Sequence, residues 1–295
     1  MGFGIIFKCP LCNTGNQIDH FPSPQAFRDN AIHHFSLDHA SPEKFAKNPF
    51  GFIVELLRPS LIAWALVSLT LGISYGAVFG DLETFMESLS AIIDMMPNLE
   101  GFAIEENFLA VVTMIIAITA VIGPMMQVNR MIDEEKKNRT EPIYARAIQR
   151  NTMQVRVLII ACIGITINLL MGGLGLYAGI VSTMNEPIGF FVVLGAVFNY
   201  SFAMFFMIGF IMLLGSLHPR ISIYAWVYLA YSFMVLYIGS LLNLPTIFGF
   251  ITPFGHVAQM PIESFNVLAS IIMLFMALVM IAIAMNRYRH RDLIG

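Results

Sequence analysis

Six long apolar stretches dominate this chain of 295 residues and leave few folds open to it. They cover approximately residues 61–80, 107–128, 157–181, 188–217, 221–248 and 264–285, and none of them contains Asp, Glu, Lys or Arg. A bilayer core is about 30 Å thick, so about 20 mostly apolar residues make one spanning helix. Lipid offers the backbone no hydrogen-bond partners, so such stretches should be helical. We therefore predict an all-α, multi-pass membrane protein with six transmembrane helices.

Composition agrees with a membrane protein built around one large domain. Hydrophobic residues make up 57% of the chain and charged residues 12%, whereas a soluble domain averages about 25% charged residues. Residues 1–50 hold no apolar core followed by a small-residue cleavage site, so we expect no secretory signal peptide. We predict an N-terminal cytoplasmic extension over residues 1–40 and a six-helix membrane domain over residues 41–295.

The charged residues divide between the two sides of the predicted membrane domain. Every Lys and Arg lies before the first stretch, between the second and third, between the fourth and fifth, or after the sixth. The other connecting segments carry acids and no Lys or Arg: Asp81, Glu83, Glu87, Asp94, Glu100, Glu105, Glu106, Glu186 and Glu263. Positively charged segments tend to stay in the cytoplasm. We therefore predict that both termini are cytoplasmic.

Two further segments have the pattern of helices that lie on the membrane surface. Residues 41–60, SPEKFAKNPFGFIVELLRPS, place apolar residues at near-helical spacing behind a possible Ser41 cap. Residues 81–96 place apolar residues on one helical face and acids on the other. The alternative for both segments is a loop end that packs on its neighbours.

The most charged stretch, MIDEEKKNRTEPIYARAIQR, joins the second and third apolar stretches. Seven of the 16 Lys and Arg lie between Arg130 and Arg156. Glu135 and Arg139 are four residues apart, a spacing that supports a helix, and Thr140 can cap a second helix that runs from Glu141 to about Gln154. We predict a cytoplasmic coupling helix that offers a charged face to a soluble partner. The alternative is a solvated loop.

Three motifs in order resemble one known family. The charged stretch is similar to the cytoplasmic loop of type-2 ABC exporter permeases, in the branch called exporters of polyketide antibiotics, or tetronasin-type exporters. The matching residues are Glu134, Glu135, Asn138, Arg139, Glu141 and Arg150, with Asn138 in place of the usual glycine and Pro142 in place of the usual leucine. SYGAVFGDLETF at residues 74–85 and TPFGHVAQMP at residues 252–261 also resemble stretches of that family.

The resemblance runs from about Ala40 to the C-terminus and implies the C-terminal six-span half of such a permease. It implies a second permease half, identical or not, and a separate ABC ATPase that binds ATP and Mg. It gives this chain no cofactor and no catalytic residue, so the chain would be a transporter subunit rather than an enzyme. The residues implied to contact the ATPase are Glu134, Glu135, Arg139, Glu141, Ile143 and Arg150.

The resemblance also implies a place and a cargo. The protein would lie among the lipids of a prokaryotic plasma membrane and would export a hydrophobic or amphiphilic compound, such as an antibiotic, ionophore, peptide or lipid, by alternating access. The two motifs outside the charged stretch fall on the predicted outer side. Their residues are candidates for an outer gate: Tyr75, Phe79, Asp81, Pro253, Phe254, His256 and Pro261.

The residues themselves favour an external energy source. A secondary transporter usually needs ionisable residues inside the membrane, and the six stretches have none. The chain also has no GxxxxGK[ST] phosphate loop. Energy must come from another subunit, or the protein is a passive channel-like conduit.

A metal site is a further alternative. Cys9 and Cys12 form a CxxC, and His20, His33, His34 and His39 follow it, so zinc is conceivable in a membrane enzyme or a zinc-dependent sensor. A second CxxC is missing, and the histidine spacing fits no standard finger. Nucleic-acid binding is not expected, because the basic residues come without an aromatic reading surface.

We expect the polar and small residues inside the apolar stretches to hold the helices together rather than to take part in chemistry. Asn168, Asn199 and Asn243 are expected to form hydrogen bonds between helices, and the glycines of MGGLGLYAG at residues 171–179 should allow close helix packing. His256 would hold a turn bounded by Pro253 and Pro261 rather than act in catalysis.

Overall fold

The computed structural model describes residues 49–82, 104–136, 150–239, 245 and 247–290. The chain divides into two units, Met1–Pro49 and Phe50–Gly295, and the fold described below is that of the second unit. The predicted extension over residues 1–40, with Cys9 and Cys12, lies outside the described residues.

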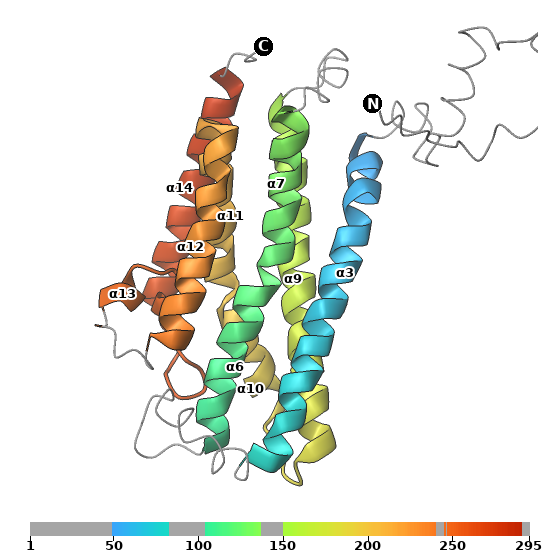
Figure 1. Ribbon diagram of the computed structural model, residues 1–295, viewed down its shortest axis with the longest axis vertical. Helices are drawn as coiled ribbons and strands as arrows, with labels where there is room; N and C mark the ends of the chain where they lie inside the picture. Colours follow the sequence, from blue (N-terminus) through green and yellow to red (C-terminus); the bar gives the residue numbers. More distant parts are fainter. Residues whose placement is uncertain (1–48, 83–103, 137–149, 240–244, 246, 291–295) are drawn as a thin grey trace, which may run out of the picture. The chain divides into compact units, whose positions relative to one another are not determined.

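Every regular element in the described ranges is helical (Figure 1). The α-helices are α3 Pro49–Ala77, α6 Ile104–Ala120, α7 Ile122–Lys136, α9 Arg150–Thr183, α10 Phe190–Asn199, α11 Ser201–Leu217, α12 Ile223–Phe233, α13 Ile247–Phe250 and α14 Val267–His290. Short 3-10 turns cover η1 Val78–Asp81, η2 Pro219–Ser222 and η4 Phe254–His256, and a π-helical turn, η3, covers Met234–Ile238.

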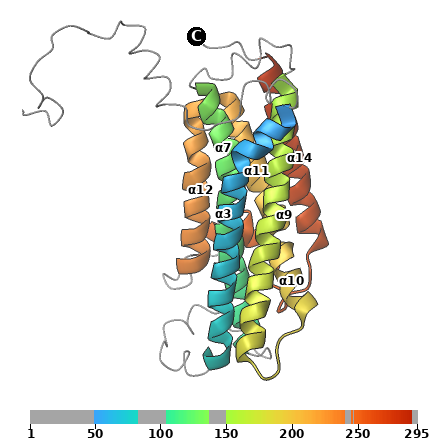
Figure 2. The same cartoon turned by 90° about the vertical axis from the view of Figure 1, so that its right-hand side faces the viewer.

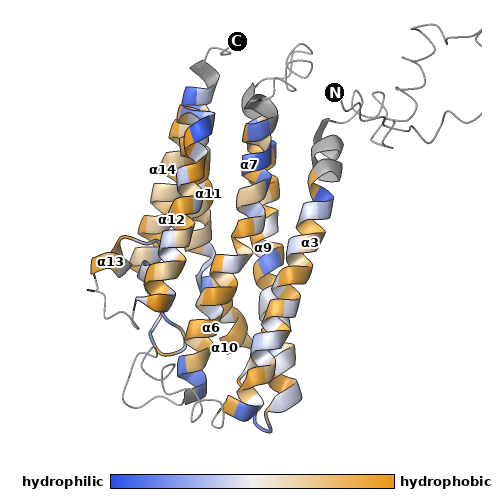
Figure 3. Ribbon diagram, viewed as in Figure 1, coloured by the Kyte–Doolittle hydropathy of each residue, from blue (hydrophilic) through white to orange (hydrophobic). Residues whose placement is uncertain are grey.

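The prediction of six spans is confirmed. Six helical segments are long and apolar enough to cross a membrane: Leu57–Asp81, Glu105–Asp133, Met153–Thr183, Phe190–Leu217, Pro219–Ile238 and Val267–Tyr288. Successive spans run in opposite directions (Figure 1). The outermost ones expose large apolar side chains such as Leu66, Val227 and Phe275, and the hydropathy colouring shows apolar residues along the length of these helices (Figure 3). Exposed apolar surface of this extent is expected of helices that face lipid or another membrane segment.

Charge separates the two ends of this bundle. The start of α3, the end of α7, the start of α9 and the end of α14 lie at one end (Figure 1). That basic end carries Arg58, Arg130, Arg156, Arg220 and Arg287. The opposite, acidic end carries Asp81, Glu105, Glu106, Glu186 and Glu263. The bundle therefore arranges the charges as the sequence pattern predicted.

The surface helix predicted before the first span is not a separate element in its described part. α3 runs without interruption from Pro49 into the span and contains Pro59. A proline inside a helix removes one backbone hydrogen bond and clashes with the preceding turn, and the first part of α3 is bent relative to the rest (Figure 2). Residues 41–48 lie outside the described residues.

The second span changes from α6 to α7 at Val121. Pro124 has no backbone N–H, so the Ala120 carbonyl oxygen loses its ordinary helical donor four residues on. The side-chain amide of Asn168, on α9, donates to this oxygen at 2.9 Å. This bond between helices confirms the structural reading of Asn168.

The fourth and fifth spans differ from the continuous helices expected for them. The fourth is divided at Tyr200 into α10 and α11. The described part of the fifth, Pro219–Ile238, finishes with a π-helical turn, and Ile247–Phe250 forms the helix α13. These two departures from regular α-helix both lie towards the acidic end.

Glycines hold α3 and α9 in close contact, as expected for the glycine-rich stretch at 171–179. A Cβ atom added to Gly179 would lie 2.6 Å from the Gly76 Cα, and one added to Gly76 would lie 2.8 Å from the Gly179 Cα. Gly72 and Gly175 are likewise pressed against the backbone of the other helix. Small residues allow such approach where lipid supplies no hydrophobic drive for helix association.

Candidate functional site

The acidic end holds a compact segment between the fifth and sixth spans, residues 247–262, here called the acidic-end loop. α13 opens it, η4 lies in its middle, and a cis Met260–Pro261 bond lies near its end. His256 Nε2 donates to the Phe250 carbonyl oxygen at 2.7 Å, and the Gly255 backbone N–H donates to Thr252 Oγ1 at 3.0 Å. The loop is therefore held together by its own polar groups.

Side chains from two spans bind this loop to the bundle. The Tyr228 hydroxyl donates to the Ile251 carbonyl oxygen at 2.6 Å, and the Tyr231 hydroxyl donates to the Phe248 carbonyl oxygen at 3.2 Å. Asn199, at the break of the fourth span, donates to the Ala258 carbonyl oxygen at 2.7 Å. Because these donors satisfy loop carbonyls, the irregular backbone can lie beside membrane helices.

The predicted gate residues fall into two groups. Pro253, Phe254, His256 and Pro261 lie in the acidic-end loop, where Pro253 and Phe254 are buried and His256 is exposed. The other three, Tyr75, Phe79 and Asp81, lie at the acidic end of the first span.

The first-span group does not form one cluster with the loop group among the contacts of the described residues. The buried Phe79 ring packs edge-on against Phe108 of α6, with centroids 5.1 Å apart. Asp81 is exposed. Tyr75 is half-buried and packs against the apolar core of the bundle. A gating role for either group stays a prediction.

An apolar cavity of about 340 Å³ lies between the loop and three spans. Met114 of α6, Val235 and Leu236 of the π-helical turn, and Phe254 of the loop form apolar walls. The buried Tyr200 also lines it. Sequence reasoning missed Tyr200 and Val235, because nothing in an unbroken apolar run marks the break or the π-helical turn that brings them here.

A second, more polar cavity of about 560 Å³ adjoins the loop. His256, Glu263 and Asn266 line it, and Phe250 and Gly255 line both cavities. Glu263 Oε2 accepts a hydrogen bond of 2.9 Å from the Gln259 backbone N–H. This bond holds the Glu263 carboxylate beside the end of the acidic-end loop, where it lines the second cavity.

The basic end holds the residues predicted to couple to an ATPase. Glu134 and Glu135 lie in the last turn of α7, and Arg150 is the first residue of α9, but their side chains are outside the described set. Arg139, Glu141 and Ile143 lie wholly outside the described residues, as does the predicted coupling helix up to residue 149. The structure therefore places the two ends of the charged stretch at the same end of the bundle (Figure 1).

The last turns of α7 are attached to the neighbouring connection. Asn129 Nδ2 donates to Asp133 Oδ2 at 3.1 Å, and Ser222 Oγ of η2 donates to Asn129 Oδ1 at 3.2 Å. A displacement at the end of α7 would thus act directly on the start of the fifth span.

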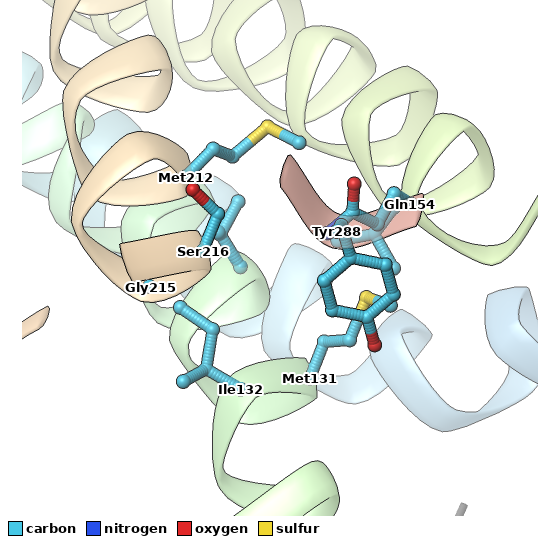
Figure 4. Close-up of a pocket in the computed structure, with 9 residues that line it drawn as sticks. Met131, Ile132, Gln154, Met212, Gly215, Ser216 and Tyr288 are labelled. Carbon is cyan, nitrogen blue, oxygen red and sulfur yellow. The ribbon is translucent and has the colours of Figure 1, made fainter. Parts of the chain in front are cut away.

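Four helices meet around a small cavity just inside the basic end (Figure 4). Met131 and Ile132 of α7, Gln154 of α9, Ser216 of α11 and Tyr288 of α14 line it. Its volume of about 20 Å³ is enough for a single water molecule. The buried Gln154 Oε1 has no hydrogen-bond partner within the described residues, and its amide points into this space.

A family model of known membrane proteins matches most of this chain. The family model described as the C-terminal domain of the multidrug efflux system permease Rv1217c matches residues 47–289. The chain belongs to this family. The match covers all six spans, both cavities of the acidic end and both borders of the charged stretch.

A curated relative agrees with the family model. The multidrug efflux system permease protein Rv1217c of Mycobacterium tuberculosis (strain ATCC 25618 / H37Rv) is 25% identical over 247 residues, which is 83% of this chain. The aligned part is 45% of the relative's length, so the chain spans about half of that protein.

Proposed function

We propose that this chain is one permease half of an ATP-driven ABC exporter that moves hydrophobic or amphiphilic compounds out of the cytoplasm or the inner leaflet. The observation that carries the proposal is the family match over residues 47–289. The matched range includes all six spans and the charged connection between the second and the third. The resemblance to exporters of polyketide antibiotics points to antibiotics or ionophores among the cargoes.

The charge pattern supports one orientation. The basic end would face the cytoplasm and the acidic end the outside, since Lys and Arg are retained on the cytoplasmic side. Both termini and the charged stretch would then be cytoplasmic, in a prokaryotic plasma membrane. The acidic-end loop and its two cavities would face outwards.

ATPase contact through residues 134–150 fits the way α7 and α9 are built. Both helices continue from the basic end deep into the bundle, and α9 is bonded to the second span through Asn168. Glu134, Glu135, Arg139, Glu141, Ile143 and Arg150 would bind the ATPase by charge and packing. Force applied there would move α7 and α9 together and change the access of the cargo path.

A second permease half completes the proposal. The relative is about twice as long as the aligned part, so this chain would pair with a copy of itself, with a sister subunit, or with a further part of a longer protein. The exposed apolar faces of the spans would be shared between that half and lipid. ATP and Mg would bind the partner subunit, because the sequence has no phosphate loop.

Transport by inside-out vesicles tests the function. The chain is co-expressed with its candidate ATPase, and accumulation of a labelled hydrophobic antibiotic is followed after ATP is added. We expect uptake with ATP and none with a non-hydrolysable analogue. Equal uptake with and without ATP would contradict the proposal and favour a passive conduit.

A further inference from the structure

The two cavities of the acidic end lie on either side of the same piece of chain. Phe250, Gly255 and Val257 line both of them. One cavity is lined mainly by apolar residues, which come from the loop and from three spans, and the other by residues of the loop and the start of the sixth span, with His256, Glu263 and Asn266 among them. Adjacent apolar and polar spaces suit a ligand with both characters.

The apolar cavity has the size and lining of a small-molecule site. Its volume of about 340 Å³ falls within the range of about 300–1,000 Å³ found for ligand pockets. Apolar walls with a few fixed polar groups are typical of such pockets, and here Tyr200 and Gln259 supply the polar groups. A π-helical turn forms one wall, and π-turns often occur at functional sites.

Charge decides which ligand the polar cavity accepts. Glu263 is the acidic residue that lines it, and Arg and Lys are absent from its described lining. The segments that follow the first, third and fifth apolar stretches, which lead to this end of the bundle, hold nine acids and no Lys or Arg. A surface of one sign concentrates ligands of the opposite sign, so an anion would be repelled and a cation attracted. The Phe250 ring in the shared wall can also attract a cation over its face.

We propose that the acidic-end loop forms a binding site for cationic amphiphiles. The apolar part enters the cavity beside Met114, Val235 and Phe254, and the cationic group lies near Glu263. This site names a class of cargo for the exporter and so rests on the proposed function, but binding to it needs neither ATP nor a partner subunit.

Equilibrium binding to the full chain tests the site. The purified protein is placed in lipid nanodiscs without nucleotide. Binding of hexyltrimethylphosphonium, a cation with a separate apolar tail, is compared with that of hexyldimethylphosphine oxide, an uncharged molecule with the same tail. The charge test is Glu263→Gln, which keeps an oxygen to accept the Gln259 N–H. Its control is Glu186→Gln, which removes an exposed charge at the same end, away from both cavities.

The cavity test is Val235→Phe, which fills part of the apolar space. Its control is Val227→Phe, an exposed position of the same span. We expect Glu263→Gln to weaken phosphonium binding about fivefold and to leave the oxide unchanged. Val235→Phe should weaken both ligands, whereas both control variants should bind like the wild type.

The proposal is overturned if Glu263→Gln and Glu186→Gln give equal affinities, or if Val235→Phe binds both ligands like the wild type. Because binding is measured without an ATPase, failure of this test leaves ATP-driven transport standing. Conversely, a protein that binds the phosphonium at Glu263, but for which ATP drives the export of no compound in the vesicle assay, would contradict the exporter function and leave the binding site standing.

Discussion

Asn168 supplies the hydrogen bond that Pro124 cannot make. The Ala120 carbonyl oxygen would ordinarily accept from the backbone N–H of residue 124, which proline lacks, and Asn168 Nδ2 lies 2.9 Å from it instead. The amide is 1% exposed, so the bond lies where water cannot replace it. One pair of residues thus both permits the break in the second span and joins that span to the third.

Replacing Asn168 should destabilise the bundle, and replacing Pro124 in the same chain should restore most of the lost stability. We expect Asn168→Leu to lower the free energy of unfolding in mixed micelles by about 1 kcal/mol, since hydrogen bonds between membrane helices contribute about 0.6 to 2 kcal/mol. In the double variant with Pro124→Ala, residue 124 regains its N–H, and most of the loss should disappear. Additive effects of the two substitutions would show that the residues do not share this carbonyl.

The α3–α9 contact should tolerate no side chain at Gly179. A Cβ there would lie 2.6 Å from Gly76 Cα and 2.7 Å from the Ile73 carbonyl oxygen, so Gly179→Leu must push the helices apart, at a cost of about 1–3 kcal/mol or more. The neighbouring Ala178 is exposed, and Ala178→Leu serves as the control. Equal melting temperatures for the two variants would refute close packing at this point.

Asn199 holds the acidic-end loop to the break in the fourth span. Its amide donates to the Ala258 carbonyl oxygen at 2.7 Å and is 5% exposed. Asn199→Leu should release the loop while the helices keep their packing, so hydrogen exchange should rise within residues 247–262 and stay low in α9. Exchange that rises evenly along the chain would instead mean that the substitution unfolds the bundle.

The number of spans and the distribution of charge followed directly from the sequence, because a bilayer permits few alternatives for long apolar runs. The close helix packing at the glycines of residues 171–179 was likewise predictable, because several small residues follow one another inside an apolar stretch. The break at Tyr200 and the π-helical turn before Gly239 were not, because both lie inside apolar runs where no proline and no charged residue stands beside them to mark them. The cavity that they form with the loop was missed for the same reason, although Phe254 and His256 had been selected from a motif.

The proposed orientation predicts which positions reagents can reach from outside the cell. In a background of Cys9→Ser, Cys12→Ser and Cys162→Ala, a cysteine replaces exposed Asn185 at the acidic end or exposed Arg220 at the basic end. A membrane-impermeant maleimide should label the first in intact cells and the second only after permeabilisation. Labelling of Arg220→Cys in intact cells would invert the assignment.

Co-purification from native membranes tests the central claim most directly. The tagged chain is extracted in a mild detergent beside Arg139→Glu, which reverses a charge in the stretch between α7 and α9, and the proteins that accompany each are identified. We predict that an ABC ATPase subunit accompanies the wild type, and that the variant loses it while retaining wild-type expression and melting temperature. A well-expressed wild-type chain that brings down no ATPase would contradict the claim that this permease half is driven by ATP.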